Sequence, residues 1–290
     1  MKESGTEVSV SVKKRGQVGA SMADPKVCVS LEGTTVKEMA DEAARANLAG
    51  ADYVEVRFDR LYLKRPEAQP VEDENGEVKH VMPPETEWPI RDMATIDVDA
   101  SIQSLKESIP LPVIFTVRSS DEGGHYPGDE GQRHEILQKG IASGVNTVDL
   151  ELSIDESVRS NLLEQASAGG VSVISSIHDV NTTPSAEELV GMVNEHAKEG
   201  EVFKFCGTVN DHQDALQIVE ASYELKGSNH AFSMMALGNG GDWARLHAPV
   251  LGQSLVYATL RSEFKLSNNC LLYTSPSPRD NTLSRMPSSA

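Results

Sequence analysis

Eight short apolar runs rich in β-branched residues recur along the chain, and stretches with helical spacing of apolar residues lie between most of them. The strand-like runs are residues 26–30, 52–57, 112–117, 146–152, 171–177, 201–205, 231–237 and 254–260. The helical stretches begin after Thr34 and at residues 131, 157, 185 and 211, and they end at Gly50, Gly144, Gly170, Gly200 and Gly227. A glycine at this position is typical of a helix C-cap.

Strands that alternate with helices predict an α/β fold with a parallel sheet and crossover helices. A doubly wound open sheet satisfies this pattern, but eight units in about 250 residues favour a (β/α)8 TIM barrel. An insertion over residues 63–97, rich in proline and glutamate, follows the second strand and is predicted to be an irregular surface excursion. Residues 25–268 are assigned to the barrel, and the polar residues 1–24 are predicted to be a disordered extension.

The composition narrows the classes of partner. The chain has 26 basic and 44 acidic side chains, a formal net charge of −18, which disfavours nucleic acids and anionic membranes. No apolar run approaches the ~20 residues that span a bilayer, and the N-terminus has no signal-peptide core, so we expect a cytoplasmic protein. The cysteines form no CxxC pair, and Cys28 and Cys206 are expected only to pack in the core.

Charged side chains cluster in or just after the predicted strands, where a barrel places its active site. Taken singly, such a histidine is more often structural and such a lysine more often an ion-pair partner. A histidine and a lysine on consecutive strands make catalysis the better interpretation. The candidates are Glu55, Arg57, Arg118, Glu122, Asp149, Glu151, His178 and Lys204.

Lys204 lies in a short apolar strand, between Phe203 and Phe205, whose side chains are expected to point toward the helices. Burial should lower the pKa of Lys204, and a neutral amine forms an imine with a ketone. His178 could then move a proton beside the iminium carbon, with Glu122 orienting its ring, and the arginines could bind a carboxylate. This combination predicts imine-forming catalysis on an anionic keto acid.

Six strings carry a resemblance to a known family. They are "VEVR", "FTVRSSDEGG", "VDLEL", "SSIHDVNTTPS", "FKF", and an arginine followed by "VLGQSLVYA". In order and spacing they resemble type I 3-dehydroquinate dehydratase, with the greatest similarity to archaeal members, over residues 26–267.

The resemblance implies a (β/α)8 barrel that dehydrates 3-dehydroquinate to 3-dehydroshikimate in the shikimate pathway, without metal or cofactor. Family members are often dimers, so the resemblance also implies a homodimer. The small-molecule substrate 3-dehydroquinate is the other expected binding partner. Lys204 matches the imine-forming lysine, His178 the general acid and base, and Glu122 the carboxylate paired with that histidine. The substrate-binding positions match Ser30, Glu55, Arg57, Arg118 and Arg245, and Asp149 matches an acidic position that supports the lysine or the histidine.

The end of the chain departs from the family. After the eighth strand the family has a loop with a serine, which Ser267 could supply, then a Gly-Gln pair and a last amphipathic helix. Residues 269–290 have neither, and their three prolines disfavour a helix. They are interpreted as a non-native tail that replaces the last helix, with a natural disordered tail as the alternative. The sequence therefore predicts that the gene encodes an active enzyme but that this exact chain is impaired.

Three alternatives stay open at this point. Another imine-forming barrel enzyme, such as a class I aldolase, would share the chemistry of Lys204. A non-catalytic binder of small anions would keep the arginines and tolerate loss of the lysine. A metal enzyme could use His178, Asp149 and Glu151, but the nearby lysine and arginines oppose a cation.

Overall fold

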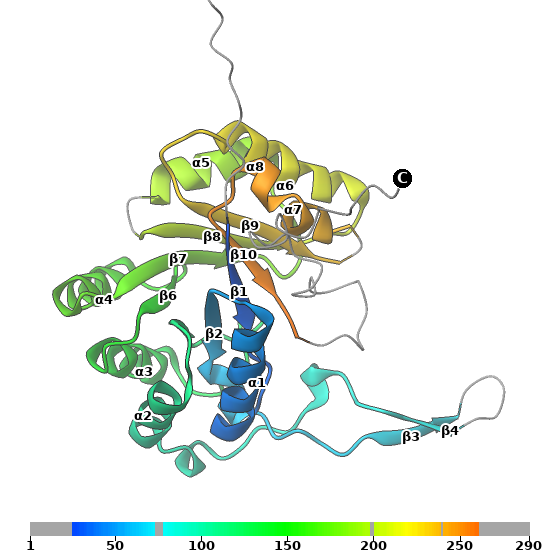
Figure 1. Cartoon of the computed structure of the whole chain (residues 1–290), viewed down its shortest axis with the longest axis vertical. Helices are drawn as coiled ribbons and strands as arrows, with labels where there is room; N and C mark the ends of the chain where they lie inside the picture. The colour runs from blue at the N-terminus through cyan, green and yellow to red at the C-terminus, as the bar shows by residue number, and fades with distance from the viewer. Residues whose placement is uncertain (1–24, 73–77, 198–199, 239, 261–290) are drawn as a thin grey trace, which may run out of the picture.

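Eight parallel strands form one sheet that curls into a barrel with helices on its outside (Figure 1). The computed structural model describes residues 25–72, 78–197, 200–238 and 240–260. The predicted extension 1–24, Ser267 and the predicted tail 269–290 lie outside these residues. In sheet order, the strands are β10 (Leu255–Ala258), β1 (Lys26–Ser30), β2 (Tyr53–Arg57), β5 (Val113–Thr116), β6 (Thr147–Glu151), β7 (Ser172–His178), β8 (Val202–Thr208) and β9 (Phe232–Leu237).

The two ends of this sheet meet, so the barrel is nearly closed. The backbone N–H of Ser254, just before β10, donates to the Phe232 carbonyl of β9 at 2.9 Å. The side-chain amide of buried Gln253 adds two bonds to one residue of β9, because it accepts from the Met234 N–H and donates to the Met234 carbonyl, both at 3.1 Å. The predicted TIM barrel is confirmed, and the open doubly wound sheet is excluded.

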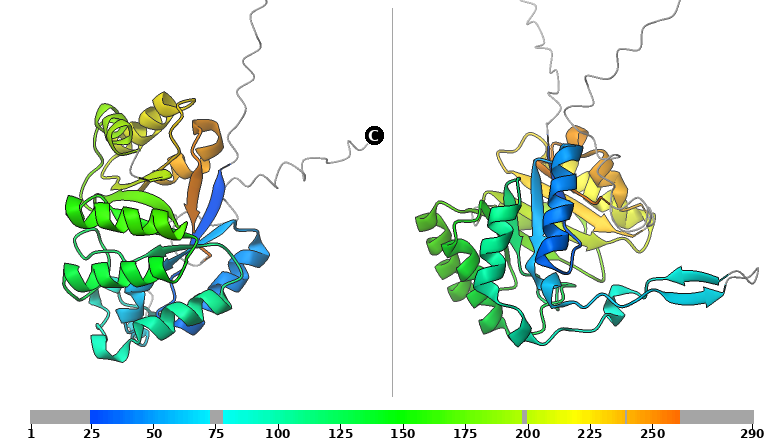
Figure 2. Two further views of the ribbon diagram at one scale, coloured as in Figure 1. Left: turned by 90° about the vertical axis from the view of Figure 1, so that its left-hand side faces the viewer. Right: turned by 60° about the horizontal axis from the view of Figure 1, so that its bottom comes forward.

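Helices link the consecutive strands and cover the outer face of the barrel (Figure 2). They are α1 (Val36–Ala49), α2 (Val98–Ser108), α3 (Glu130–Ala142), α4 (Glu156–Gly169), α5 (Ala186–His196), α6 (His212–Leu225), α7 (Asp242–Leu246) and α8 (Ala248–Leu251). Side chains of Thr35, Asp129, Asp155, Ser185 and Asp211 cap the N-termini of α1, α3, α4, α5 and α6. None of the helices in the described part of the chain is long and apolar enough to cross a membrane.

The glycine rule for helix ends is only partly right. Gly50 and Gly170 are the left-handed C-caps of α1 and α4, as predicted. The caps of α3 and α6 lie one residue before the expected glycine, and α5 is capped by Ala197, three residues before Gly200. The pattern also missed α2, α7 and α8. The first follows the insertion without a glycine stop, and the other two are only 5 and 4 residues long.

Strand alternation divides the side chains between two layers. Phe203 and Phe205 pack outward against α5 and α6, as predicted, in a cluster that contains Leu189 and Ile218. The inward positions lower in the barrel form a separate apolar cluster that includes Cys28, Ile114, Ile174, Met235 and Leu255. Inward positions nearer the C-terminal strand ends carry the polar and charged groups, so the site rests on an apolar floor.

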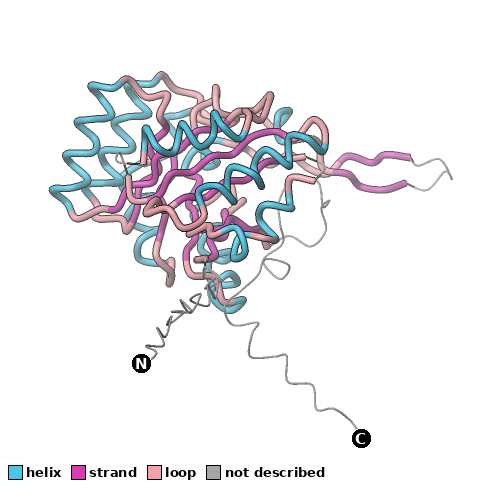
Figure 3. The backbone as a smooth tube through the Cα atoms, turned by 90° about the horizontal axis from the view of Figure 1, so that it is seen from above, coloured by secondary structure: helices cyan, strands magenta, loops and turns pink. Residues whose placement is uncertain are grey.

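The insertion after β2 contains a two-stranded antiparallel ribbon, β3 (Gln69–Glu72) and β4 (Val78–Val81), that stands clear of the barrel (Figure 3). All eight strand residues are exposed, so the prediction of a surface excursion is confirmed, although the segment is less irregular than expected. Short 3-10 helices flank the ribbon at Phe58–Tyr62 (η1), Glu85–Glu87 (η2) and Met93–Thr95 (η3). The insertion rejoins the barrel beside η1, where Leu63 pairs with Ile90.

Candidate active site

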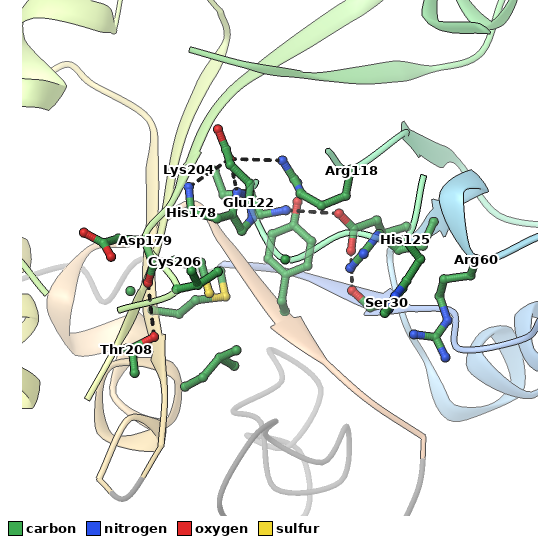
Figure 4. Close-up of a pocket in the computed structure, with 18 of the residues that line it drawn as sticks. Ser30, Arg60, Arg118, Glu122, His125, His178, Asp179, Lys204, Cys206 and Thr208 are labelled. Atoms are coloured by element: carbon green, nitrogen blue, oxygen red, sulfur yellow. Dashed lines mark hydrogen bonds and ion pairs between the residues drawn. The ribbon is translucent and has the colours of Figure 1, made fainter. Parts of the chain in front are cut away.

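A cavity of about 300 Å³ opens at the C-terminal ends of the barrel strands (Figure 4). Seven of the nine predicted site residues line it, namely Ser30, Glu55, Arg57, Arg118, Glu122, His178 and Lys204. They come from β1, β2, β7, β8 and the segment after β5, although up to 174 residues separate them in sequence (204 minus 30). The barrel therefore assembles the site that the strand-end pattern predicted.

Lys204 lies at the centre of the barrel and is surrounded by acidic and aromatic side chains. Its Nζ is 3.0 Å from Oε1 of Glu55 and 3.1 Å from Oδ2 of Asp149. The same nitrogen lies over the ring of Tyr257, 4.2 Å from the ring centroid, a cation–π contact. The side chain is only 4% exposed, so these groups replace water as its solvation.

These contacts overturn the expected neutral amine. Burial on its own disfavours the ammonium, as the sequence argument assumed, but the charges of Asp149 and Glu55 outweigh it and raise the pKa of Lys204. Conversely, Arg118 and Lys204 hold the pKa of Asp149 at about 2 against the opposing effect of burial. In the resting site Lys204 is thus an ammonium paired with two carboxylates.

His178 is oriented by Glu122 through a single carboxylate oxygen. Oε2 of Glu122 lies 3.0 Å from the His178 backbone nitrogen, whose N–H donates to it, and 3.0 Å from the ring Nδ1. An ionised carboxylate can only accept hydrogen bonds, so with Glu122 ionised the ring proton lies on Nδ1 and is donated to this oxygen. That leaves the other ring nitrogen, Nε2, with a free lone pair.

The pKa values of His178 and Glu122 are shifted in opposite directions. Burial, with the nearby charges of Arg118 and Lys204, lowers the pKa of His178 well below its ordinary value, so the imidazole is neutral. Burial and the neighbouring Glu151 carboxylate raise the pKa of Glu122 to about 7. The imidazole is therefore uncharged and able to accept a proton at neutral pH, while the carboxyl of Glu122 changes its protonation state in the same pH range.

Arg118 neutralises the acidic side of the barrel. Its Nη1 donates to Glu151 at 2.8 Å and to Ser176 at 3.1 Å, and its Nη2 donates to Asp149 at 3.2 Å. Asp149 therefore bridges Arg118 and Lys204, which fits the supporting role expected for it. Glu151 is an ion-pair partner of Arg118 and of Arg133.

The other predicted binding residues differ in their placement. Arg57 lines the cavity and forms two bonds to Asp59, at 2.9 and 2.8 Å. Ser30 donates to Oε2 of Glu55. Among the described residues, those that line the cavity do not include Arg245, which is buried on α7 and pairs with Asp242 at 2.6 Å. Its role in binding a carboxylate stays a prediction, as does that of Ser267, which lies outside the described residues.

Comparison with known proteins identifies the family. The sequence model of type I 3-dehydroquinase matches residues 27–270. The chain belongs to this family. The resemblance drawn from the six strings is thereby confirmed, and the chain is assigned to the lyases that dehydrate 3-dehydroquinate in the shikimate pathway.

Relatives and solved structures agree with this family. The 3-dehydroquinate dehydratase of Methanosarcina acetivorans is 29% identical over 225 residues, 77% of this chain and 81% of that protein. That of Methanopyrus kandleri is 28% identical and covers 82% of this chain and 91% of its own length. The crystal structure of 3-dehydroquinate dehydratase from Geobacillus kaustophilus, 20% identical, matches the fold with a TM-score of 0.70 over 90% of this chain and 93% of its own.

Among the described residues, no group of histidine, cysteine and acidic side chains has an arrangement that could hold a metal ion. Asp149 and Glu151, two of the three ligands considered for a metal enzyme, already pair with Lys204 and the arginines. The geometry therefore gives no support to the metal-enzyme alternative.

The sequence argument missed several residues of this 3-dehydroquinase site. Cys206 was expected only to pack, but it lines the cavity, as does Thr208. Both lie on the Lys204 face of β8, two and four residues on, so strand alternation could have revealed them. Tyr257 is likewise an inward position of β10.

Another missed feature is a cluster at the cavity mouth, formed by Arg60, Glu85 and His125. Arg60 donates to both carboxylate oxygens of Glu85 at 2.7 Å, and to the Glu32 carbonyl. Nε2 of His125 is 3.7 Å from Glu85. Glu85 belongs to the insertion, and nothing in its sequence indicates that it reaches the active site.

We expect Glu85→Ala to raise KM for 3-dehydroquinate about fivefold, or about 1 kcal/mol, with little change in kcat. The reason is that Arg60, at the cavity wall, loses the carboxylate that fixes its position. Steady-state kinetics would measure this. As a control, an Asn-Gly turn should replace residues 70–80, because the flanking Gln69 and Val81 pair directly, and KM should stay unchanged. An equal rise in KM in both variants would show that the ribbon, rather than Glu85, is responsible.

Proposed function

We propose that this chain dehydrates 3-dehydroquinate to 3-dehydroshikimate through an imine on Lys204, with His178 as the general acid and base and Glu122 as its orienting partner. The observation that carries the proposal is the joint placement of a buried lysine and a histidine–glutamate pair in one cavity of a chain that belongs to this family. The contacts of the individual residues support these roles.

The first step forms the imine. Neutral His178 accepts a proton from Lys204 as the amine adds to the ketone carbon. This proton passes to the carbinolamine oxygen, and a second proton moves from the nitrogen to the same oxygen, which then leaves as water and gives the iminium. Nζ begins as an ammonium and ends as an iminium, so it has a positive charge at both stages. Glu55 and Asp149, 3.0 and 3.1 Å from Nζ, stabilise both cations, which makes the raised pKa of Lys204 compatible with its role.

The second step eliminates water. Nε2 of His178 removes a proton from the carbon beside the iminium, and the C–H electron pair forms an enamine. The enamine electrons expel the hydroxyl group from the next carbon as the imidazolium returns the proton to it. Hydrolysis of the conjugated imine then releases the product and restores Lys204. The carboxylate of the substrate would be bound by the cavity arginines, of which Arg57 is less enclosed than Arg118.

Imine trapping tests the covalent step. Incubation with 3-dehydroquinate and borohydride, followed by peptide mass spectrometry, should give a reduced adduct on Lys204 and on no other lysine. Conversion should appear as absorbance of the conjugated product. A folded chain that turns over 3-dehydroquinate without such an adduct would contradict the mechanism, and one that neither turns over nor traps would contradict the proposal altogether.

The aldolase-like and anion-binding alternatives have separate signatures. An aldolase would cleave retro-aldol substrates, and a binder would retain 3-dehydroquinate after loss of Lys204 while the parent chain shows no turnover.

The proposal also includes a homodimer in the cytoplasm, with residues 25–268 as the catalytic barrel. Light scattering would measure the oligomeric state. The non-native-tail hypothesis is tested by replacing residues 268–290 with a family-like Gly-Gln loop and helix, which should raise both the melting temperature and activity.

A further inference from the structure

Glu122 separates two cavities. On one side is the active-site cavity, and on the other is an outer cavity of about 590 Å³ lined by Leu152, Ser153, Arg159, Glu195 and His196 among others. Glu122 is the only one of the described residues that lines both. Glu122, whose carboxylate orients His178, is therefore also accessible to groups outside the active site.

The two carboxylate oxygens of Glu122 contact residues of different cavities. Oε2 accepts from the backbone and the ring of His178, both at 3.0 Å, while Oε1 accepts from the hydroxyl of Ser153 at 2.6 Å. Ser153 is exposed and lies in the turn after β6, where the strand-end candidates of the sequence did not extend. The exposed hydroxyl is thus linked to the imidazole through one carboxylate.

The turn that carries Ser153 is held in place independently of Glu122. The N–H of Leu152 donates to the Ser176 carbonyl on β7 at 2.9 Å. The carbonyl of Leu152 accepts from Nη1 of Arg159 on α4 at 2.7 Å. These bonds fix the hydroxyl next to the carboxylate without a contribution from the Ser153 side chain.

The charges around Glu122 oppose one another. Arg118, at 3.6 Å, favours its ionised form, whereas burial and the carboxylates of Glu151 and Asp149 disfavour it, with a resulting pKa of about 7. Its partner His178 is neutral. The outer cavity adds the charged or titratable groups Glu156, Arg159, Glu195 and His196. Because the resulting pKa lies near neutral pH, a hydrogen bond to the carboxylate changes its ionised fraction measurably in this pH range.

We propose that Ser153 is a positioning residue for the dehydration reaction: by donating to Oε1 it stabilises the ionised carboxylate of Glu122 and so keeps His178 in its Nδ1–H tautomer. This inference rests on the proposed function. If Glu122 is protonated, its O–H can donate to Nδ1, the ring proton then resides on Nε2, and the base that removes the substrate proton is lost. Ser153 therefore sets the acidic limit of activity through two other residues.

The test is the pH dependence of kcat/KM in Ser153→Ala. We expect the acidic limb to move upward by about one pH unit, since a hydrogen bond to the charged form lowers a carboxylate pKa. This shift reduces kcat/KM about tenfold at pH 6 but less than about twofold above pH 8. Ser153→Thr, which keeps the hydroxyl, should restore the parent profile.

A matched control is Ser157→Ala, because Ser157 is an exposed serine at the start of α4 whose hydroxyl donates to Asp155 at 2.5 Å. It should leave the profile unchanged. A Ser153→Ala profile that superimposes on the parent would overturn the proposal. So would an equal loss at every pH, which indicates a structural role, or a Ser153→Thr variant that behaves like alanine.

A second readout does not depend on turnover. The ring ¹⁵N shifts of His178 report the tautomer directly, and the pH at which the Nδ1–H form gives way should rise by about one unit in Ser153→Ala. If the parent chain neither traps nor converts 3-dehydroquinate, the proposed function fails, while the nitrogen shifts still decide whether Ser153 controls the tautomer. An unchanged tautomer midpoint would overturn the proposal in either case.

Discussion

Lys204→Met should reduce kcat/KM by at least about 10⁴-fold and abolish the borohydride adduct, as loss of a covalent nucleophile does in other enzymes. Methionine is similar in length and still fills the space under the Tyr257 ring, but it offers no amine. Absorbance of the conjugated product and mass spectrometry of the trapped protein measure both effects. Residual turnover within about 100-fold of the parent would mean that another group forms the intermediate, or that no imine forms.

The same substitution should destabilise the fold, because Glu55 and Asp149 stay buried without the cation between them. We expect the free energy of unfolding to fall by roughly 3 kcal/mol near pH 7, since removal of one partner leaves the other buried charges without a counter-charge. The sign follows from the pKa shifts. The lowered pKa values of the carboxylates stabilise above their unfolded values, and the raised pKa of Lys204 stabilises below its own.

The destabilisation by Lys204→Met should therefore be greatest between about pH 4 and about pH 10 and diminish outside this range. Urea unfolding at pH 3.5 and pH 7 would measure the difference. Lys26→Met is a matched control, because Lys26 forms an exposed ion pair with Asp52 at 3.4 Å, and such pairs contribute little. An equal destabilisation at both pH values would indicate lost packing rather than lost charge.

His178→Asn should separate imine formation from elimination. Asparagine can still donate to Glu122 from its amide, but it has no basic nitrogen, so kcat should fall by about 10² to 10⁴-fold, the usual contribution of general acid–base catalysis. The adduct on Lys204 should still form with 3-dehydroquinate, more slowly than in the parent. Single-turnover trapping at a series of times measures this step.

A control for position is Glu122→Gln, which keeps a side chain of the same shape beside His178. It should lower kcat less than His178→Asn does, because the imidazole is retained but its tautomer is no longer fixed. Complete loss of trapping in folded His178→Asn would show that the imine does not form without this histidine and would contradict the expected separation of the two steps.

The order of the strands and the location of the site could be predicted because both depend on local pattern and on the rules of parallel sheets. Lys204 and His178 were correctly placed on neighbouring strands, which the structure pairs with Ser176 opposite Lys204 and His178 opposite Cys206. The charge of Lys204 could not be predicted this way. Its two partners lie 149 and 55 residues away, and only the folded barrel determines how closely they approach.

The cavity mouth and the outer side of Glu122 were missed for the same reason. Glu85 lies in an insertion that has no strand or helix periodicity leading it toward the site, and Ser153 is one polar residue in an exposed turn. Glu85 acquires its role through contacts with Arg60 and His125, and Ser153 through its contact with Glu122. A residue that acts through neighbours distant in the sequence has no local sequence signature.

The strand pairing around the barrel is weaker on the side where Gln253 lies. Strands β1 and β10 pair over four registered positions. Within the described part of the chain, β9 is joined to the segment that begins β10 by one backbone bond and by the side-chain amide of Gln253. The barrel therefore has weaker pairing between β9 and β10 than between β1 and β10. If the barrel opens on heating, we expect the separation to begin between β9 and β10, which would leave β10 paired with β1 and move Tyr257 away from Lys204.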